Sequence, residues 1–325
     1  MQSILEQRDF PRSGRRDRIL IAAVGRTGSS WLVRALGRSE GTEMWFEPDT
    51  IDLVPDAGFV GTTGFGPYPI IHPGEDGGVY RSLWDVVFTA GVTRKQADKI
   101  IPLVRPLMKL PNSVLQPMIR LGGKVISKVP MQRQRNLAKT ILAPFAIEWL
   151  VETYDPRVVV TQRHPYSMVA SWRDIKLPKF DLLTRPAFRE LYGDRYEGEP
   201  PTDADSDLTQ AAWVVGFLTT ILGEAVDRHP EWLVVNHEDM CIDPIAKFQA
   251  LSEILEIPWS TKVAEYLEAS NRPGQGFVNN RITSEEVNKW RKNLSPDEIG
   301  EIKSVLSRFP RHGWIKQPDD WESLI

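Results

Sequence analysis

The stretch that decides the fold is RILIAAVGRTGSSWLVRAL, residues 18–36. Residues 19–24 form a short apolar run rich in branched side chains, which predicts a strand covered on both faces in a parallel sheet. A tight turn follows at residues 25–28, and Ser29 or Ser30 can cap the helix after it. The sequence therefore predicts a strand, a polar loop and a helix N-terminus in direct succession.

This loop has the features of an anion-binding site. A helix N-terminus leaves backbone N–H groups unpaired, and the helix dipole favours negative charge there. Glycines allow a close backbone approach, the hydroxyls of Thr27, Ser29 and Ser30 add donors, and Arg26 adds a fork-shaped cation. A triphosphate-binding GxxxxGK[ST] loop would need a lysine that is missing here. We expect a phosphate or sulfate group at this loop.

Composition excludes several classes of protein. The 325 residues are 41% hydrophobic with a formal net charge of -3, which predicts a globular protein with an ample core and argues against nucleic acid as partner. The single cysteine, Cys241, allows no intramolecular disulfide or CxxC site, and the five histidines have no HxxxH spacing, so no metal is expected. Without a signal-like or membrane-spanning apolar run, we expect a cytoplasmic protein. Composition leaves the oligomeric state open.

Short strands alternate with helices along the chain. Further apolar runs predict strands at residues 43–48, 124–129, 157–162 and 232–236. Helical spacing predicts helices at residues 135–153, from residue 167, at 207–228 and at 245–255. Residues 49–83 and 178–206 are expected to be loops, and prolines should break 84–121 into short helices. The pattern predicts one α/β domain over residues 1–325, with a parallel sheet of about five strands flanked by helices.

A second constellation follows the predicted strand at 157–162. Arg163 comes directly after this strand, and Ser171 follows eight residues later. An arginine can grip an anion with two parallel hydrogen bonds, and a serine adds a hydroxyl. Because the carboxyl ends of parallel strands meet at one edge of a sheet, we expect both residues to converge with loop 25–31, with Glu47 and with Lys128.

Both constellations resemble those of sulfotransferases that use 3′-phosphoadenosine 5′-phosphosulfate (PAPS). GRTGSSW is similar to their 5′-phosphosulfate loop, and the spacing from Arg163 through Pro165 to Ser171 is similar to their 3′-phosphate segment. Looser matches are WLVVNHEDMCIDP at 232–244, the Arg-Pro-Gly stretch at 272–274, and the Trp-Arg pair at 290–291. The resemblance implies a P-loop-NTPase-like sulfotransferase fold, PAPS as co-substrate and no metal.

The resemblance also implies roles for individual residues. Arg26 takes the place of the basic residue at the bridging oxygen, and Lys128 is a second candidate for stabilising the sulfonyl group. Glu47 matches the base of carbohydrate-type members, whereas the aryl and steroid branch uses a histidine near the third strand that this chain lacks; His72 is an outside alternative. The expected co-substrate-binding residues are Arg26, Thr27, Gly28, Ser29, Ser30, Trp31, Arg163, Ser171, Arg272 and Gly274.

The function implied is transfer of the sulfonyl group from PAPS to a hydroxyl or amine. The Glu-Pro element at 47–48 favours a carbohydrate, glycolipid or small-molecule acceptor, held by the insertions at 49–120 and 178–206. Two alternatives stay open. A P-loop-type nucleotide kinase or hydrolase would need magnesium and a loop lysine, and a non-catalytic protein would bind the nucleotide without transfer.

Overall fold

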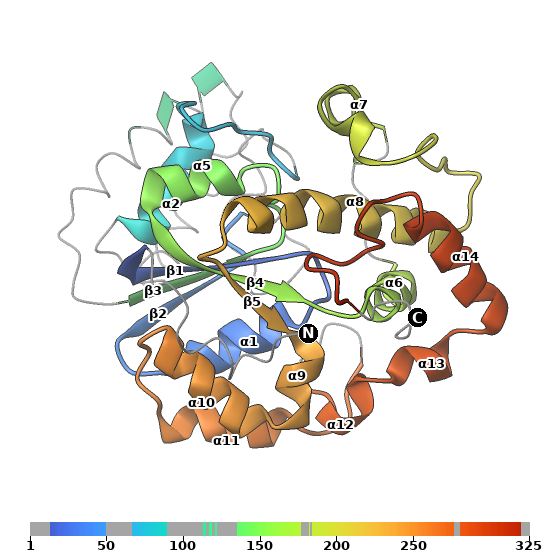
Figure 1. Ribbon diagram of the computed structural model, residues 1–325. Helices are drawn as coiled ribbons and strands as arrows, with labels where there is room; N and C mark the ends of the chain where they lie inside the picture. The colour runs from blue at the N-terminus through green and yellow to red at the C-terminus, as the bar shows by residue number, and fades with distance from the viewer. Residues whose placement is uncertain are drawn as a thin grey trace.

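The centre of the molecule is a five-stranded parallel sheet (Figure 1). The structure is a computed structural model that describes residues 14–49, 67–89, 113–114, 117–118, 121, 135–176, 182, 184–275 and 280–319. The strands lie in the order β2-β3-β1-β4-β5, and every neighbouring pair is parallel. Their bounds are β1 Arg15–Ala23, β2 Thr42–Phe46, β3 Arg135–Thr140, β4 Pro156–Gln162 and β5 Leu233–Asn236. The predicted α/β class and strand number are confirmed.

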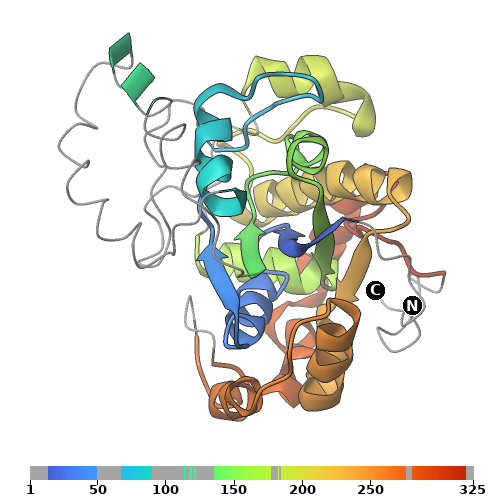
Figure 2. The same cartoon turned by 90° about the vertical axis from the view of Figure 1, so that its left-hand side faces the viewer.

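Helices cover both faces of the sheet (Figures 1 and 2). One face carries α1 (Ser29–Leu36), α9 (His237–Ile242), α10 (Pro244–Ile254) and α11 (Thr261–Ser270). The other face carries α2 (Gly78–Phe88), α5 (Ile147–Tyr154) and α8 (Asp207–Arg228). The remaining helices are α6 (Pro165–Asp174), α7 (Pro186–Tyr192), the 3₁₀ helix η3 (Gly193–Arg195), α12 (Thr283–Glu286), α13 (Lys289–Asn293) and α14 (Pro296–Leu306). In Figure 1, α6, α12 and α13 lie beyond the arrowheads of β4 and β5.

The side chains of β1 alternate between two cores. Ile19 and Ile21 pack on the side of α1, while Leu20 and Ala22 pack on the side of α8, and all four are buried. This alternation is what a strand covered on both faces requires, because successive side chains point to opposite faces. The apolar run that predicted β1 is therefore explained by two cores that share one strand.

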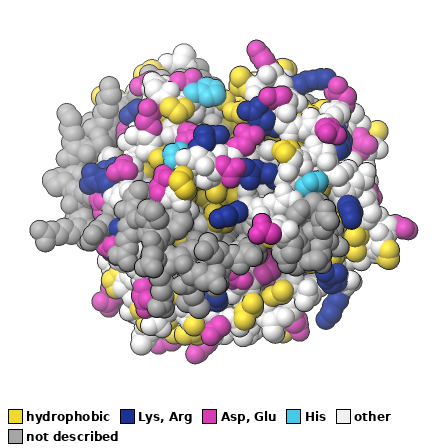
Figure 3. All heavy atoms as spheres, in the orientation of Figure 1, with side chains coloured by type: hydrophobic (Ala, Val, Ile, Leu, Met, Phe, Trp, Pro, Cys, Tyr) yellow, Lys and Arg dark blue, Asp and Glu magenta, His cyan; other side chains and the backbone are white. Residues whose placement is uncertain are grey.

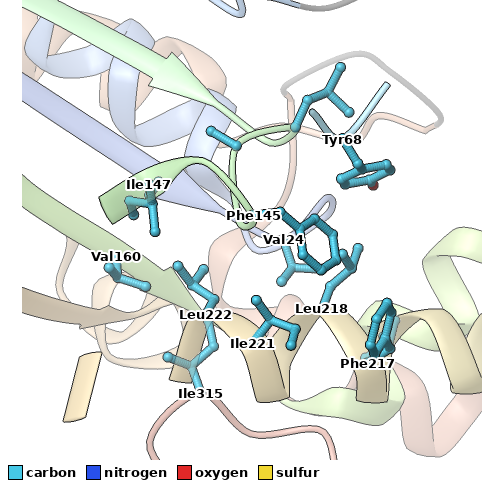
Figure 4. Packing of buried hydrophobic residues seen from close by; sticks show 14 of the residues in the cluster. Val24, Tyr68, Phe145, Ile147, Val160, Phe217, Leu218, Ile221, Leu222 and Ile315 are labelled. Carbon is cyan, nitrogen blue, oxygen red and sulfur yellow. The ribbon is translucent and has the colours of Figure 1, made fainter. Parts of the chain in front are cut away.

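Helix α8 is the longest helix of the core on the side of the sheet that α2, α5 and α8 cover. Figure 4 shows its Leu218, Ile221 and Leu222 packed toward Val24, which directly follows β1, and toward Val160 of β4. In the described part of the chain, α8 is the one helix long and apolar enough to cross a membrane by length and composition, and most of it is buried inside the protein. The apolar character of α8 is thus accounted for by the core.

The third strand lies in a different place from the one predicted. Residues 135–140 were expected to begin a helix, but they form β3, and the helical part of that segment is α5, which starts only at Ile147. The strand predicted at 124–129 lies outside the described residues. The helix prediction failed because RNLAKT has polar side chains where a buried strand should be apolar, and these find buried partners only in the folded protein.

Three smaller expectations also need correction. The segment 178–206 contains α7 and η3, so it is not a loop throughout, and α2 begins at Gly78, inside the predicted loop 49–83. The N-cap of α1 is Gly28 with φ 82°, and no side chain caps the helix. Without a capping side chain, the N–H groups of Ser29 and Ser30 at the start of α1 receive no acceptor from a cap.

Candidate active site at the carboxyl ends of the strands

The loop after β1 is a tight turn with two left-handed residues, Arg26 (φ 76°) and Gly28 (φ 82°). A Cβ at Gly28 would lie 2.2 Å from Nδ1 of His237, so only glycine fits between the loop and the end of β5. Turns with left-handed residues direct backbone N–H groups into an anion-binding concavity. One donor expected there is already used, because the N–H of Trp31 donates to the carbonyl of Gly28.

Contacts to β4 and α6 hold this loop in place. The indole N–H of Trp172 donates to the carbonyl of Gly25 at 3.0 Å. The hydroxyl of Thr27 donates to the carbonyl of Val24 at 3.0 Å and lies 2.6 Å from the hydroxyl of Thr161. The Thr27 hydroxyl is therefore used inside the protein, and the donor that Thr27 can offer an anion is its backbone N–H.

The two predicted constellations meet at this loop. Nε of Arg26 donates to the hydroxyl of Ser171 at 2.8 Å. Nη1 of Arg163 donates to the carbonyl of Arg26 at 3.3 Å. The structure thus brings Arg26, after β1, to Arg163 at the end of β4 and to Ser171 of α6, which follow it in the chain by 137 and 145 positions. An anion held by the loop and one held by Arg163 would be neighbours.

A third arginine, which sequence reasoning missed, joins Arg26 and Arg163. Burial, followed by the charges of Arg163 and Arg281, lowers the pKa of Arg26 to about 10. Burial and Arg163 likewise lower the pKa of Arg281. The sequence had pointed to Arg272 for the late arginine, but that side chain is exposed. The sequence around Arg281 holds no local signal of a site, because Arg163, which lies close to it in the structure, is distant in sequence.

The carboxylate among these arginines is Glu286 of α12. Its Oε2 lies 3.0 Å from Nη2 of Arg163, and its Oε1 lies 3.9 Å from Nε of Arg281 and 3.0 Å from Nζ of Lys289. A second carboxyl, Glu238, accepts from the backbone N–H of His164, and burial raises its pKa. Three guanidinium groups and one ammonium thus exceed the negative charge of the described acids that face them. Such an excess is the electrostatic signature of an anion site.

A buried ion pair lies at the ends of β2 and β3. Nζ of Lys139 pairs with Oε1 of Glu47, and both side chains are almost fully buried. Nζ of Lys139 is also 3.4 Å from the hydroxyl of Ser30, which ties the pair to the loop. Burial, followed by the charges of Arg26 and Arg34, lowers the pKa of Lys139 well below its usual range, so its ammonium depends on Glu47.

The role that the sequence gives to Lys128 stays a prediction, and the structure adds Lys139 as a second lysine at a strand end. Lys128 lies outside the described residues, whereas Lys139 stands at the carboxyl end of the third strand of the sheet. Oε2 of Glu47 is buried and has no hydrogen-bond partner among the described residues. The sequence holds no local signal for Lys139, because the spacing of apolar residues predicts a helix at residues 135–140.

A further buried carboxyl, Asp49, follows Glu47. Its Oδ2 accepts from the hydroxyl of Thr140 at 2.7 Å and from the hydroxyl of Tyr80 at 2.9 Å. Burial raises the pKa of Asp49 to about 6, because the two hydroxyl donors offset only part of the desolvation of the charged form. Lys139 and Thr140 are successive residues of a strand, so Glu47 and Asp49 contact opposite faces of β3.

A neutral histidine lies beneath the loop. Burial, followed by the charges of Arg163, Arg281 and Arg26, lowers the pKa of His237 well below its usual range. Its ring packs edge-on against Trp31, and Nε2 lies 3.5 Å from Sγ of Cys241. No group of three or more His, Cys, Asp or Glu side chains in the described residues could hold a metal ion.

Charge of both signs is spread over the outside of the molecule. Figure 3 shows dark blue and magenta side chains interspersed across the visible described surface. The arginines of the site differ from these surface charges because they are buried or half-buried, with Arg163 only 8% exposed. The cationic character of this region is therefore internal, which suits a small enclosed anion better than a polyanion.

Comparison with solved structures found sulfotransferases. No protein-family profile matches this sequence, and no curated protein matches it. The sulfotransferase domain from the curacin biosynthetic pathway is 14% identical with a TM-score of 0.47, over 93% of this chain and 98% of that chain. Sulfotransferase STF9 from Mycobacterium avium is 13% identical with a TM-score of 0.43, over 90% and 75% of the two chains.

A mammalian structure shows the same level of similarity. Mouse sulfotransferase SULT7A1 complexed with PAP is 12% identical with a TM-score of 0.39, over 99% of this chain and 93% of that chain. These likenesses are distant. The chemistry of the site in this chain therefore has to be argued from its own residues.

Proposed function

We propose that this protein is a PAPS-dependent sulfotransferase. The observation that supports this most directly is the joining of two strand ends by Arg26, which bonds to Ser171 and whose carbonyl accepts from Arg163. One anion at the loop and a second at Arg163 call for a ligand with two separate phosphate-type groups. A 3′-phosphorylated adenosine nucleotide has this pattern.

The residues present fit such a nucleotide. Nε of Arg163 is buried without a hydrogen-bond partner among the described residues, which leaves a charged donor for the 3′-phosphate. The early N–H groups of α1, together with Arg26, would hold the 5′-phosphosulfate. Ser171 would complete the 3′-phosphate site, and Arg281 would add charge beside it. The looser candidates Arg272 and Gly274 stay predictions.

The reaction would be an in-line displacement at sulfur. The acceptor oxygen or nitrogen forms a bond to the sulfur of PAPS while the bond from sulfur to the bridging phosphate oxygen breaks. The bridging oxygen takes the negative charge, and adenosine 3′,5′-bisphosphate leaves. Arg26, and Lys139 while its pair with Glu47 keeps it protonated, would lie close enough to this loop to stabilise that charge. Positioning and electrostatics supply most of the rate.

Glu47 is our candidate for the base. It would take the proton of the acceptor hydroxyl or amine on Oε2, the oxygen that Lys139 does not hold. Lys139 would keep the carboxylate in place and ionised before the acceptor arrives. We extend the proposal to a carbohydrate, glycolipid or small-molecule acceptor because a Glu-Pro follows the second strand, and we place the reaction in the cytoplasm.

Two measurements test the proposal. Calorimetry should detect binding of adenosine 3′,5′-bisphosphate without metal and find no comparable binding of ATP with magnesium. Incubation with PAPS labelled in its sulfonyl group and an extract of small molecules and glycolipids should then yield a labelled product. Tight binding of ATP with magnesium and none of the bisphosphate would instead support the kinase or hydrolase alternative. Binding without transfer to any acceptor would support the non-catalytic one.

A further inference from the structure

Glu286 occupies the charged centre of the anion site from inside the protein. Its two oxygens contact three cationic groups, from Arg163, Arg281 and Lys289. Glu286 is 5% exposed and Arg163 8% exposed, so this is a buried interaction and not a surface pair. A carboxylate with two oxygens between guanidinium groups presents the same acceptors to Arg163 that a phosphate would present.

The contact competes with any anion that needs Arg163. Nη2 of Arg163 is bonded to Glu286 and Nη1 to the carbonyl of Arg26, which leaves Nε of this guanidinium unpaired among the described residues. A phosphate cannot approach Arg163 closely while a buried carboxylate is bonded to the same group, because two like charges at that distance in a desolvated site repel. One of the two anions has to withdraw.

From this geometry we propose that Glu286 is an internal stand-in for the 3′-phosphate. In the free protein it holds Arg163, Arg281 and Lys289 together, and the 3′-phosphate displaces it on binding. Because α12 is a single short turn that carries Glu286, displacement requires that turn to move and leaves the strand ends in place. This inference rests on the proposed function, since it takes a 3′-phosphorylated nucleotide as the ligand.

The proposal makes Glu286 a built-in competitor that lowers the affinity of the free protein for a 3′-phosphate. A nucleotide without a 3′-phosphate would meet the Glu286 carboxylate at Arg163 and gain nothing by displacing it. A nucleotide with a 3′-phosphate replaces the Glu286 carboxylate by a doubly charged group, so the three cations keep a negative partner. The carboxylate therefore weakens binding of nucleotides whose 3′-phosphate needs Arg163, and it leaves the binding of nucleotides without that phosphate unchanged.

The decisive variant is Glu286→Gln, measured by calorimetry with two ligands. Removing the competing charge should raise the affinity for adenosine 3′,5′-bisphosphate about tenfold, because the binding-competent fraction of the protein rises. The affinity for adenosine 5′-monophosphate should change less than about twofold, since that ligand makes no use of the site at Arg163. Glu285→Gln is the matched control, because Glu285 is the exposed neighbour and loses the same charge.

The outcomes separate the two proposals. If the wild-type protein binds neither nucleotide, the proposed function fails. If it binds the bisphosphate and Glu286→Gln binds it equally or more weakly, Glu286 positions Arg163 and the stand-in role is wrong. Should Glu286→Gln not fold, Glu286→Asp keeps the charge but withdraws the carboxylate by one methylene. That variant should gain about two- to threefold for the bisphosphate alone, and no gain there overturns the inference.

Discussion

The two buried ion pairs of the site, Glu47–Lys139 and Arg163–Glu286, lie on opposite sides of β1 and are built differently. In the first, one carboxylate meets one ammonium, and Oε2 of Glu47 is left without a described partner. In the second, Glu286 is shared among several cations, and Arg163, first among the charges that act on it, helps to lower its pKa. A balanced pair with a spare oxygen suits proton transfer, whereas a cationic excess suits anion binding.

The largest expected effect comes from breaking the balanced pair. Lys139→Met leaves the Glu47 carboxylate buried without its cation, which should lower the free energy of unfolding by about 3–5 kcal/mol. Urea denaturation at pH 7 measures this change. Adding Glu47→Met in the same chain should restore much of the loss, because both charges are then gone. A cost below about 1 kcal/mol for the single variant would mean that the pair is not ionised in the folded protein.

Breaking the Arg163–Glu286 pair should weaken binding of the nucleotide. Arg163→Ala removes the guanidinium for the 3′-phosphate and leaves the negative charge of Glu286 behind, so the Kd for adenosine 3′,5′-bisphosphate should rise about 100- to 1000-fold. Calorimetry measures it. Arg173→Ala is the control, because Arg173 lies on the neighbouring helix α6 and pairs with Asp174 and Glu298 at the surface. Equal losses in both variants would contradict a local role for Arg163.

Asp49 sharpens the comparison because, within the described part of the chain, hydroxyl groups bind it in place of a cation. Its folded-state pKa of about 6 lies above the ordinary value of 3.8, so between these values the folded state binds more protons than the unfolded state. Stability should therefore fall as pH rises from about 4 to 6, by up to about 3 kcal/mol. Asp49→Asn should lack this fall when urea denaturation is followed against pH. Parallel pH profiles of the two proteins would refute the assignment.

The smallest expected effect is on the transfer step alone. Glu47→Gln keeps the shape of the side chain but removes the base, so transfer from PAPS should slow about 100-fold. Binding of adenosine 3′,5′-bisphosphate should change much less than transfer does, because Arg163 lies across β1 from Glu47 and keeps its hold on the 3′-phosphate. Single-turnover kinetics measures the rate of transfer, and calorimetry measures binding of the bisphosphate. Unchanged turnover would exclude Glu47 as the base.

Sequence reasoning succeeded where local pattern decides the structure. The run 19–24 and the glycines after it predicted β1 and its loop, and Arg163 and Ser171 were placed correctly because a strand and a helix start fix them locally. Their convergence on the loop followed from a general property of parallel sheets. The roles of these residues in binding stay predictions.

The failures share a cause. Lys139 made residues 135–140 look unlike a buried strand, because the Glu47 that neutralises it lies 92 residues earlier in the chain. Arg281 was missed for the same reason, because it joins the site through Glu286, which contacts Arg163 only in the folded protein. Buried charge is decided by tertiary partners, and no local periodicity records it.

The long sequence separations in this site bear on how the protein is made. Arg163 meets Glu286 across 123 positions, and Gln162 exchanges two hydrogen bonds with the backbone of Lys316 across 154 positions. A ribosome makes roughly 5–20 residues each second, so Arg163 waits several seconds or more for its counter-ion after leaving the exit tunnel. During translation this end of β4 is a nascent, incomplete surface, and chaperones would have their longest opportunity to engage the chain there.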